Sequence, residues 1–397
     1  MPNDRVLAAI VLLILFSSPV AVPGRRDPET GRIRVLYIGD HGPWSPSPIL
    51  DAEPFISLKV AIAYFHVPAH IRTRMNRLYF PRTYNGLTEY DAIIISDCPV
   101  NFFEDRHYHW FKDAVIENGS GFVMIGGNGG FGGRPELPWT PTAVADILPV
   151  ECVDGGWEGG QVEIVEPGHE LIKSLPLDKK WEWMHYYDGN EIYPKQQALV
   201  LAELGPTLSG KVLPFWSTWD LGQGRTFAML GDWTPMGGEY FIRWPYYGDF
   251  AVNLMMFLTK NEIPTDIESM HQARSLYMDY RSTRSYVFSV MDFAEKFGAN
   301  MDPVGLMVIG VDETHDQSIS LYIDLDFPNA IEKLEASIDQ LLEASEKAMK
   351  MKDQVMVWIY LIEWTTVTAT FALGVFGVWT LMVRRRLYRD VGTTRLA

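Results

Sequence analysis

The stretch Gly121–Gly133, GFVMIGGNGGFGG, joins a short apolar run to a loop with glycine at six of the eight positions from Gly126 to Gly133. A buried strand that stops at consecutive glycines is typical of a central parallel strand whose C-terminal end meets a ligand crevice. Glycine there permits backbone angles and close approaches that a side chain would block. The stretch therefore predicts an α/β fold and places the candidate site at this loop.

The segments around this stretch extend the same pattern. Two apolar runs that end in glycine or aspartate, Ile33–Gly39 and Asp91–Ser96, indicate further buried parallel strands. Apolar residues at helical spacing in Glu104–Glu117 predict a crossover helix, and Thr140–Ile147 is expected to be a short helix. Shorter, alternating runs between residues 150 and 230 predict antiparallel strands on one side of the sheet. The predicted fold is a doubly wound, mainly parallel sheet with antiparallel additions.

Two apolar segments at the ends of the chain point to a membrane. Arg5 precedes a short apolar run with a small-residue exit, which is typical of a secretory signal. Near the other end, Trp364–Val383 is twenty residues without a charge, and Arg384–Arg386 follows at once. Twenty apolar residues can span a bilayer, and the arginines are expected on the cytoplasmic side.

Between the domain and this span, two further segments are expected. Leu306–Val311 and Ile319–Leu325 are rich in β-branched residues and predict a small β-hairpin after a polar helix. Apolar residues from Ile331 to Leu341 keep the spacing of a coiled-coil seam in a stalk helix. The expected organisation is a signal peptide (residues 1–22), an α/β domain (32–261), a helix plus small hairpin (262–327), a helical stalk (328–357), a transmembrane helix (358–383) and a basic tail (384–397).

Charge and cysteine content narrow the function classes. The tail carries five arginines and one aspartate, so the rest of the chain holds a net charge of −20 within the total of −16. Such an acidic body argues against nucleic acid and anionic lipid surfaces as partners. The two cysteines, Cys98 and Cys152, either form one disulfide or stay unpaired in the core. Asn118 begins a lone glycosylation sequon, Asn-Gly-Ser.

The order of four motifs resembles a known family. The motifs are YDAIIISD (Tyr90–Asp97), the glycine stretch, LPV (Leu148–Val150) and GQGRTFAMLGDW (Gly222–Trp233). Together they resemble the class I glutamine amidotransferase-like fold over about residues 32–261, and more narrowly the family labelled putative glutamine amidotransferase.

This resemblance implies a fold and a chemistry. Active members of the superfamily use a cysteine on a strand-to-helix elbow and a histidine two residues before a glutamate, and the thiolate attacks the amide. Here Gly126 or Gly127 falls where the cysteine belongs, and Gly237 stands two positions before Glu239. The resemblance therefore implies the fold, while the missing groups predict no glutaminase activity and no catalytic residue of that kind.

Polar side chains nevertheless follow several strands. Carboxylates at the strand ends would suit a cation or sugar hydroxyls, and Trp233 and Trp139 would stack on a sugar face. The alternative is that aspartates at these positions cap loops by bonding backbone amides. His107 and His109 are two apart on a predicted helix and face different sides, so no metal site is expected, and the glycine loop lacks the helix that a dinucleotide fingerprint requires, so no cofactor is expected. The ligand-crevice candidates are Asp40, His41, Asp97, Asn128, Asp232 and Trp233.

The leading functional hypothesis is a membrane-anchored extracytoplasmic amidotransferase-like domain without catalysis, which binds a ligand or a protein at the cell envelope. The alternative is a hydrolase that uses the crevice carboxylates on a glycan or peptide. The expected location is the cell membrane, with one span, the body outside and the C-terminus in the cytoplasm. Thr366, Thr370 and Gly374 form a small-residue face in the span, so a homo-oligomer or an envelope protein is a candidate partner through stalk and span, and nucleic acid is not expected.

Overall fold

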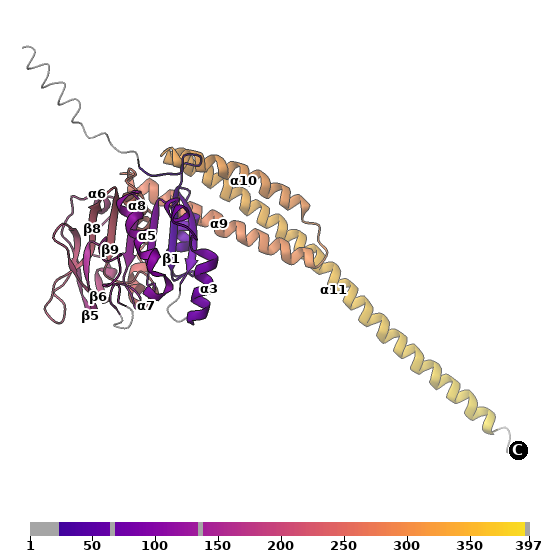
Figure 1. The fold of residues 1–397 in the computed structure, drawn as a ribbon. Helices are drawn as coiled ribbons and strands as arrows, with labels where there is room; N and C mark the ends of the chain where they lie inside the picture. The colour runs from indigo at the N-terminus through magenta and orange to yellow at the C-terminus, as the bar shows by residue number, and fades with distance from the viewer. Residues whose placement is uncertain (1–23, 64–67, 134–137, 394–397) are drawn as a thin grey trace, which may run out of the picture. The chain divides into compact units, whose positions relative to one another are not determined.

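The computed structural model describes residues 24–63, 68–133 and 138–393, which form two compact units (Figure 1). The first unit contains the chain up to Ser275 together with Leu321–Phe327, and the second contains Leu276–Ser320 and the chain from Pro328. The expected signal peptide, residues 1–22, lies outside the described residues.

The first unit is built on a mixed sheet, which confirms the predicted fold class. Its nine strands in the described chain have the order β2-β1-β3-β4-β9-β8-β7-β5-β6. The five strands from β2 to β9 are parallel, and the other four continue the sheet in antiparallel pairs on the β9 side. The strands are β1 (Ile33–Gly39), β2 (Ile56–Ile62), β3 (Ala92–Ser96), β4 (Gly121–Ile125), β5 (Val150–Ile164), β6 (His185–Pro194), β7 (Leu199–Leu204), β8 (Leu213–Leu221) and β9 (Gly224–Met229).

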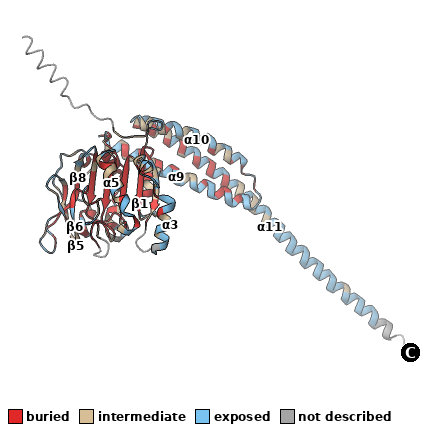
Figure 2. Cartoon of the chain, viewed as in Figure 1, coloured by how far each residue is buried: buried red, intermediate tan, exposed pale blue. Residues whose placement is uncertain are grey.

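The central strands are buried along their whole length because helices cover them. Every residue of β3 and β4 is buried, as expected for continuous apolar runs in a covered parallel sheet (Figure 2). Helix α8 is buried at nearly every position and contacts β1, β4 and β9. The helices of this unit are α2 (Ser47–Ala52), α3 (Ala69–Tyr79), α4 (Tyr84–Thr88), α5 (Asp105–Ile116), α6 (Glu170–Lys173), α7 (Pro235–Ile242) and α8 (Tyr247–Leu258), with short 3-10 turns η1 (Val100–Phe102) and η2 (Glu182–Met184).

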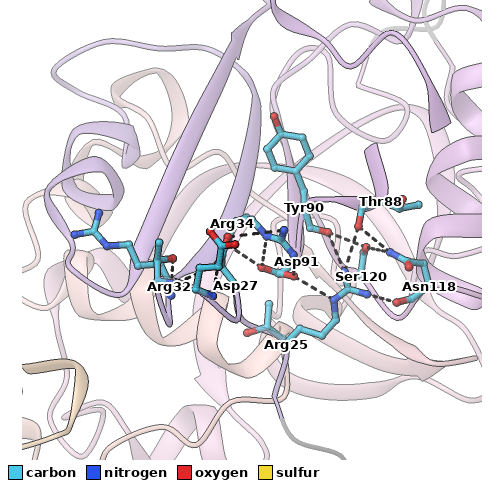
Figure 3. Close-up of polar contacts among 12 residues, drawn as sticks. Arg25, Asp27, Arg32, Arg34, Thr88, Tyr90, Asp91, Asn118 and Ser120 are labelled. Carbon is cyan, nitrogen blue, oxygen red and sulfur yellow. Dashed lines mark hydrogen bonds and ion pairs between the residues drawn. The ribbon is translucent and has the colours of Figure 1, made fainter. Parts of the chain in front are cut away.

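Asp91, just before β3, is the centre of a polar cluster at the N-terminal ends of the parallel strands (Figure 3). Its buried carboxylate accepts hydrogen bonds from the Arg34 backbone at 2.9 Å and from the Arg34 guanidinium at 3.1 and 3.2 Å. The sequon residue Asn118 is part of the same cluster, where its side-chain nitrogen donates to the Thr88 carbonyl at 3.1 Å and to the buried Ser120 hydroxyl at 3.3 Å. A glycan on Asn118 would replace one of the two hydrogens of this nitrogen, so in the folded domain at least one of the two contacts would be lost.

Residues 140–147 were expected to be a helix, and this is wrong. The segment is a series of turns with hydrogen bonds between residues three apart, from Thr142 to Trp139, from Ala145 to Thr142 and from Ile147 to Val144. Bonds between residues three apart form 3-10 turns, whereas an α-helix requires bonds between residues four apart.

The second unit consists of helices, and the predicted β-hairpin within residues 306–325 is wrong. Helix α9 (Ile267–Lys296) is followed by α10 (Asp302–Ile323) and then by α11 (Phe327–Thr393). Val304, Val308 and Val311 are buried, which is the three-and-four spacing of a helix face. The β-branched residues suggested strands, but packing against the neighbouring helices overrides this weak intrinsic preference.

Residues of the predicted coiled-coil seam pack against other helices of the same chain. Leu341 is fully buried in one apolar cluster with Val308 of α10 and Val287 of α9, and Ile338 packs against the same cluster. These two seam residues therefore face the chain's own helices and not a second copy.

Helix α11 continues without a break into the expected span. Within the described part of the chain, one helix, residues Phe327–Tyr388, is long and apolar enough to cross a membrane. Its apolar window has no buried residue, so large side chains such as Trp364, Phe371 and Leu381 are exposed along it (Figure 2).

Candidate functional site

Ser96, the last residue of β3, connects two of the predicted crevice residues. Its hydroxyl donates to Asp40 Oδ1 at 2.9 Å and accepts from the Trp233 indole Nε1 at 2.7 Å. The Tyr37 hydroxyl donates to the same Asp40 oxygen at 3.2 Å. Burial raises the pKa of Asp40 above its ordinary value of 3.8, against the opposing effect of these two hydrogen bonds. Asp40 and Trp233 are thus joined across the ends of β1, β3 and β9.

Asp97 and Asn190 hold the glycine loop from two sides. Asp97 Oδ1 accepts from the Gly129 amide at 2.5 Å, and Asp97 itself has a φ of +40°, which a residue with a side chain keeps only where its surroundings fix it. Asn190 on β6 accepts from the Gly127 amide at 2.8 Å and donates to the Gly127 carbonyl at 3.2 Å. The shape of the loop is therefore set by side chains from other elements.

Asp232, after β9, is buried and bonded to its own loop. Its two carboxylate oxygens accept from the Thr234 amide at 3.0 Å and from the Thr234 hydroxyl at 2.6 Å. Burial, followed by the charges of Asp97 and Asp40, raises the pKa of Asp232 well above 3.8. Asp40, Asp97 and Asp232 thus lie close enough to influence one another, and the Thr234 contacts are those of the loop-capping alternative.

His41 and Asn128 are placed differently from these aspartates. His41 Nδ1 lies 2.7 Å from the hydroxyl of Ser47, at the start of α2. Asn128 is half-buried in the turn of the glycine loop. In the described chain, no group of three or more His, Cys, Asp and Glu side chains is arranged to hold a metal ion.

The elbow after β4 has no space for a side chain. A Cβ atom at Gly126 would lie 2.1 Å from the Leu230 carbonyl oxygen and 2.5 Å from Asn190 Oδ1. At Gly127 a Cβ would lie 2.6 Å from Asp97 Cγ, and the φ of +127° would strain any other residue. All three distances are under the 3.0 Å that real Cβ atoms essentially always keep.

Aromatic side chains fill the space beside the loop. Trp139, Phe131 and Trp233 are fully buried, and the Trp139 indole donates to the Gly129 carbonyl at 2.7 Å. Neither tryptophan presents a ring face to solvent in this structure, so the stacking on a sugar that was expected of Trp233 and Trp139 would require the site to open.

Cys98 and Cys152 do not form a disulfide in this structure. Cys98 is fully buried, and burial, followed by the charges of Asp97 and Asp40, raises the pKa of its thiol well above the ordinary value. A nucleophilic cysteine needs the opposite shift. Cys152, on β5, is half-buried.

Sequence reasoning missed two residues of the site. Asn190 and Thr234 both contact the predicted residues directly. The signal for Asn190 was weak: a polar residue within an alternating strand more than sixty positions from the loop it holds. Thr234, two residues after Asp232, is at the spacing of a local Asp turn and could have been found from that spacing.

The family described as putative glutamine amidotransferase matches residues 57–260, about half of the chain. No curated protein sequence matches. Among solved structures, the chain is similar to a cytoplasmic protein, STM3548, of Salmonella typhimurium (22% identity, 57% of this chain and 99% of that chain covered, TM-score 0.45). A second cytoplasmic protein, STM1381 of Salmonella typhimurium LT2, gives 23% identity with the same coverage and TM-score. A cold-adapted β-galactosidase of Rahnella sp. R3 gives 17% identity over 66% of this chain and 35% of that chain, with a TM-score of 0.33.

Proposed function

The chain belongs to the putative glutamine amidotransferase family, and we propose that it is a non-catalytic member, held at the cell envelope by one membrane span, that works in binding and assembly. The body lies outside the cytoplasm, and the basic tail lies inside. The single observation that carries the proposal is the elbow at Gly126.

In an active enzyme of the superfamily this position would carry the thiolate that attacks the amide. At Gly126 the Leu230 carbonyl occupies the place of the first side-chain atom, so a cysteine could enter only if the end of β9 moved. The other half of the chemistry is also missing, because Gly231-Asp232-Trp233-Thr234-Pro235 contains no histidine. The chain therefore carries neither a cysteine at Gly126 nor a histidine between Gly231 and Pro235.

The membrane placement is supported by the apolar part of α11 and by the arginines that follow it within the same helix. The apolar part of this helix is exposed over its length, and transfer into lipid would remove that surface from water. The arginines from Arg384 onward end the apolar run, and positive residues are retained on the cytoplasmic side.

An active-site-directed reagent tests the loss of catalysis. The full chain in detergent is incubated with a glutamine analogue that alkylates catalytic thiols, such as a diazo-ketone, and its intact mass is measured. The proposal predicts no adduct on Cys98, because that thiol is buried and protonated. A stoichiometric adduct on Cys98 would mean that the domain retains a nucleophile.

Assembly is tested in native membranes. Chemical crosslinking there should give a species larger than the monomer that contains this chain. Crosslinking that yields monomer alone, under conditions that trap a known envelope complex, would remove the assembly role.

The second candidate function is a hydrolase that acts on a glycan or peptide. The observation in its favour is the grouping of Asp40, Asp97 and Asp232, with the pKa of Asp40 and of Asp232 raised, since an acid–base pair needs carboxyls of different proton affinity. Against it, Asp232 is almost fully buried and both of its oxygens are bonded to Thr234. Turnover of a glycan or peptide that is lost in Asp40→Asn, while the melting temperature is kept, would favour the hydrolase.

A further inference from the structure

The turn between α9 and α10 lies beside the part of α11 that precedes the span. Ala299 and Met301, in this turn, are buried in the apolar cluster of the second unit, and Met351 and Val355 of α11 pack against the same cluster. Figure 1 shows the same arrangement: beyond the end of the α9–α10 pair, α11 continues alone. We call residues 293–306, which contain this turn, the hairpin tip.

The hairpin tip is therefore at the level of the membrane surface if α11 spans the bilayer. The expected span begins at Trp358, three residues after Val355. At about 1.5 Å per helical residue, this separation is about 5 Å along the helix axis. The headgroup region is about 5 to 8 Å thick on each side of the hydrocarbon core, so the tip is within side-chain reach of it.

Large apolar side chains are exposed at the tip. Phe293 and Phe297 are each 43% exposed, and their rings contact each other at a tilt, with centroids 4.9 Å apart. Leu306, at the start of α10, is 71% exposed. Exposed apolar side chains of this kind on a helical unit mark a place of interaction, and the position of Phe293 and Phe297 next to the start of the span points to lipid as the occupant.

The charges of the hairpin tip indicate that its contact with the membrane depends on the burial of apolar side chains. The hairpin tip contains two acidic side chains, Glu295 and Asp302, and one lysine, Lys296, whose ammonium pairs with Asp292 just before the tip at 2.6 Å. A surface with this balance is not attracted to anionic lipid. Aromatic and leucine side chains, in contrast, enter the interface of neutral bilayers.

We propose that the hairpin tip is a second membrane contact of this chain, in which Phe297 and Phe293 enter the headgroup region of the leaflet where α11 begins its span. The inference rests on the proposed function, because it requires α11 to cross the membrane. Two contacts fix the rotation and tilt of a helix that a single span leaves free, so the tip holds the bundle in one orientation above the bilayer.

Spin-label accessibility in phosphatidylcholine vesicles tests the contact with the full chain. Cys152→Ser removes the half-buried thiol, while Cys98 is fully buried and is retained. A nitroxide is then attached at one position per sample: Phe297→Cys at the tip, Leu373→Cys in the span, or Glu313→Cys at an exposed position on α10 away from the tip. Collision rates with oxygen, which concentrates in lipid, and with a neutral nickel complex, which stays in water, are compared.

The proposal predicts that the label at 297 collides more with oxygen than with nickel, in the same sense as the label at 373, while the label at 313 shows the reverse order. A water-like ratio at 297 overturns the inference. Low collision rates with both reagents at 297 would mean that protein covers the tip, and would overturn it too. A water-like label at 373 would instead show that the span itself fails, and with it the membrane part of the proposed function.

Two further measurements separate apolar insertion from other causes. Addition of anionic phosphatidylglycerol should leave the ratio at 297 unchanged, and a lipid signal that appears only with anionic lipid contradicts the proposal. With the label at Phe293→Cys, the added change Phe297→Asp should abolish the lipid signal. The control change Ile309→Asp, at an apolar residue that is 58% exposed and lies outside the tip, should preserve it, and equal effects of the two changes contradict a contact at the tip.

Discussion

Gly126, directly after β4, has no space for a side chain. A glycine at the end of an apolar strand was readable as a loop signal, but only the structure locates the Leu230 carbonyl where a Cβ would be. Under the proposed function, the loss of the nucleophile would therefore involve the backbone packing at the ends of β4 and β9 as well as the replacement of one side chain.

Gly126→Ala should destabilise the protein, because a methyl group there meets backbone atoms that cannot rotate away. Overpacking of this kind costs about 1 to 3 kcal/mol. The matched control is Gly168→Ala, where nothing lies within 4 Å of the new Cβ, and its effect should be within about 0.5 kcal/mol. Thermal melts of the two variants make the comparison, and equal melting temperatures would show that the elbow tolerates a side chain.

Asp232 gives the stability a pH dependence. Its pKa is raised in the folded state, by burial first and then by Asp97 and Asp40, so the folded protein holds a proton that the unfolded chain releases near pH 4. The stability contributed by this proton is full below the ordinary value of 3.8 and is lost as pH rises through the raised folded pKa. The slope is at most about 1.4 kcal/mol per pH unit for one proton.

Asp232→Asn should remove this part of the pH dependence, since the amide oxygen can still accept from Thr234 and the side chain no longer titrates. Melting temperatures of the variant and the unchanged protein are measured from pH 4 to pH 8. The difference between them should grow in favour of the variant as pH rises. A constant difference over the range would mean that Asp232 does not titrate as its surroundings imply.

At the scale of elements, local pattern was sufficient for the buried strands and insufficient for the helical region. β3 and β4 are short continuous apolar runs that end in turn residues, and their length and flanking residues favour covered parallel strands. α10 was mistaken for a hairpin because its valines and isoleucines favour strands locally, while the helices that bury Val304 and Val308 are contributed by other parts of the sequence. Of the candidate site, the aspartates at the strand ends were found, but Asn190 was not, because its role depends on pairing between distant strands.

Arg274 on α9 shows another feature that local pattern could not predict. It donates to Glu53, after α2, at 3.1 Å and to Asp249 on α8 at 2.9 Å, across 221 and 25 residues of chain. All three side chains are buried. The network ties the start of α9 to two helices of the first unit.

Arg274→Met should cost about 3 to 5 kcal/mol, because it leaves two buried carboxylates without their cation. Arg243→Met is the control: its i,i+4 pair with Glu239 is exposed, and such pairs contribute about 1 kcal/mol or less. Urea unfolding of the full chain in detergent measures both. Similar midpoints for the two variants would contradict a structural role for the Arg274 network.

At the scale of the whole molecule, the chain combines an amidotransferase-like domain with a helical unit whose last helix is apolar enough to span a membrane. The apolar length of the span was readable from composition alone, because a bilayer imposes a minimum length. The sequence could not predict which helices pack against the coiled-coil seam of the stalk, since the same heptad spacing fits a second copy of the chain or the chain's own helices. The structure assigns Ile338 and Leu341 to the latter.

The most direct test of the central claim, that this domain keeps the fold of the family without its chemistry, is ammonia release from glutamine by the purified full-length chain in detergent. The account predicts no release above that of buffer at any glutamine concentration, for the unchanged protein and for Cys98→Ala alike. Saturable release that disappears in Cys98→Ala would contradict it, because the buried thiol of Cys98 would then be the nucleophile that the elbow lacks.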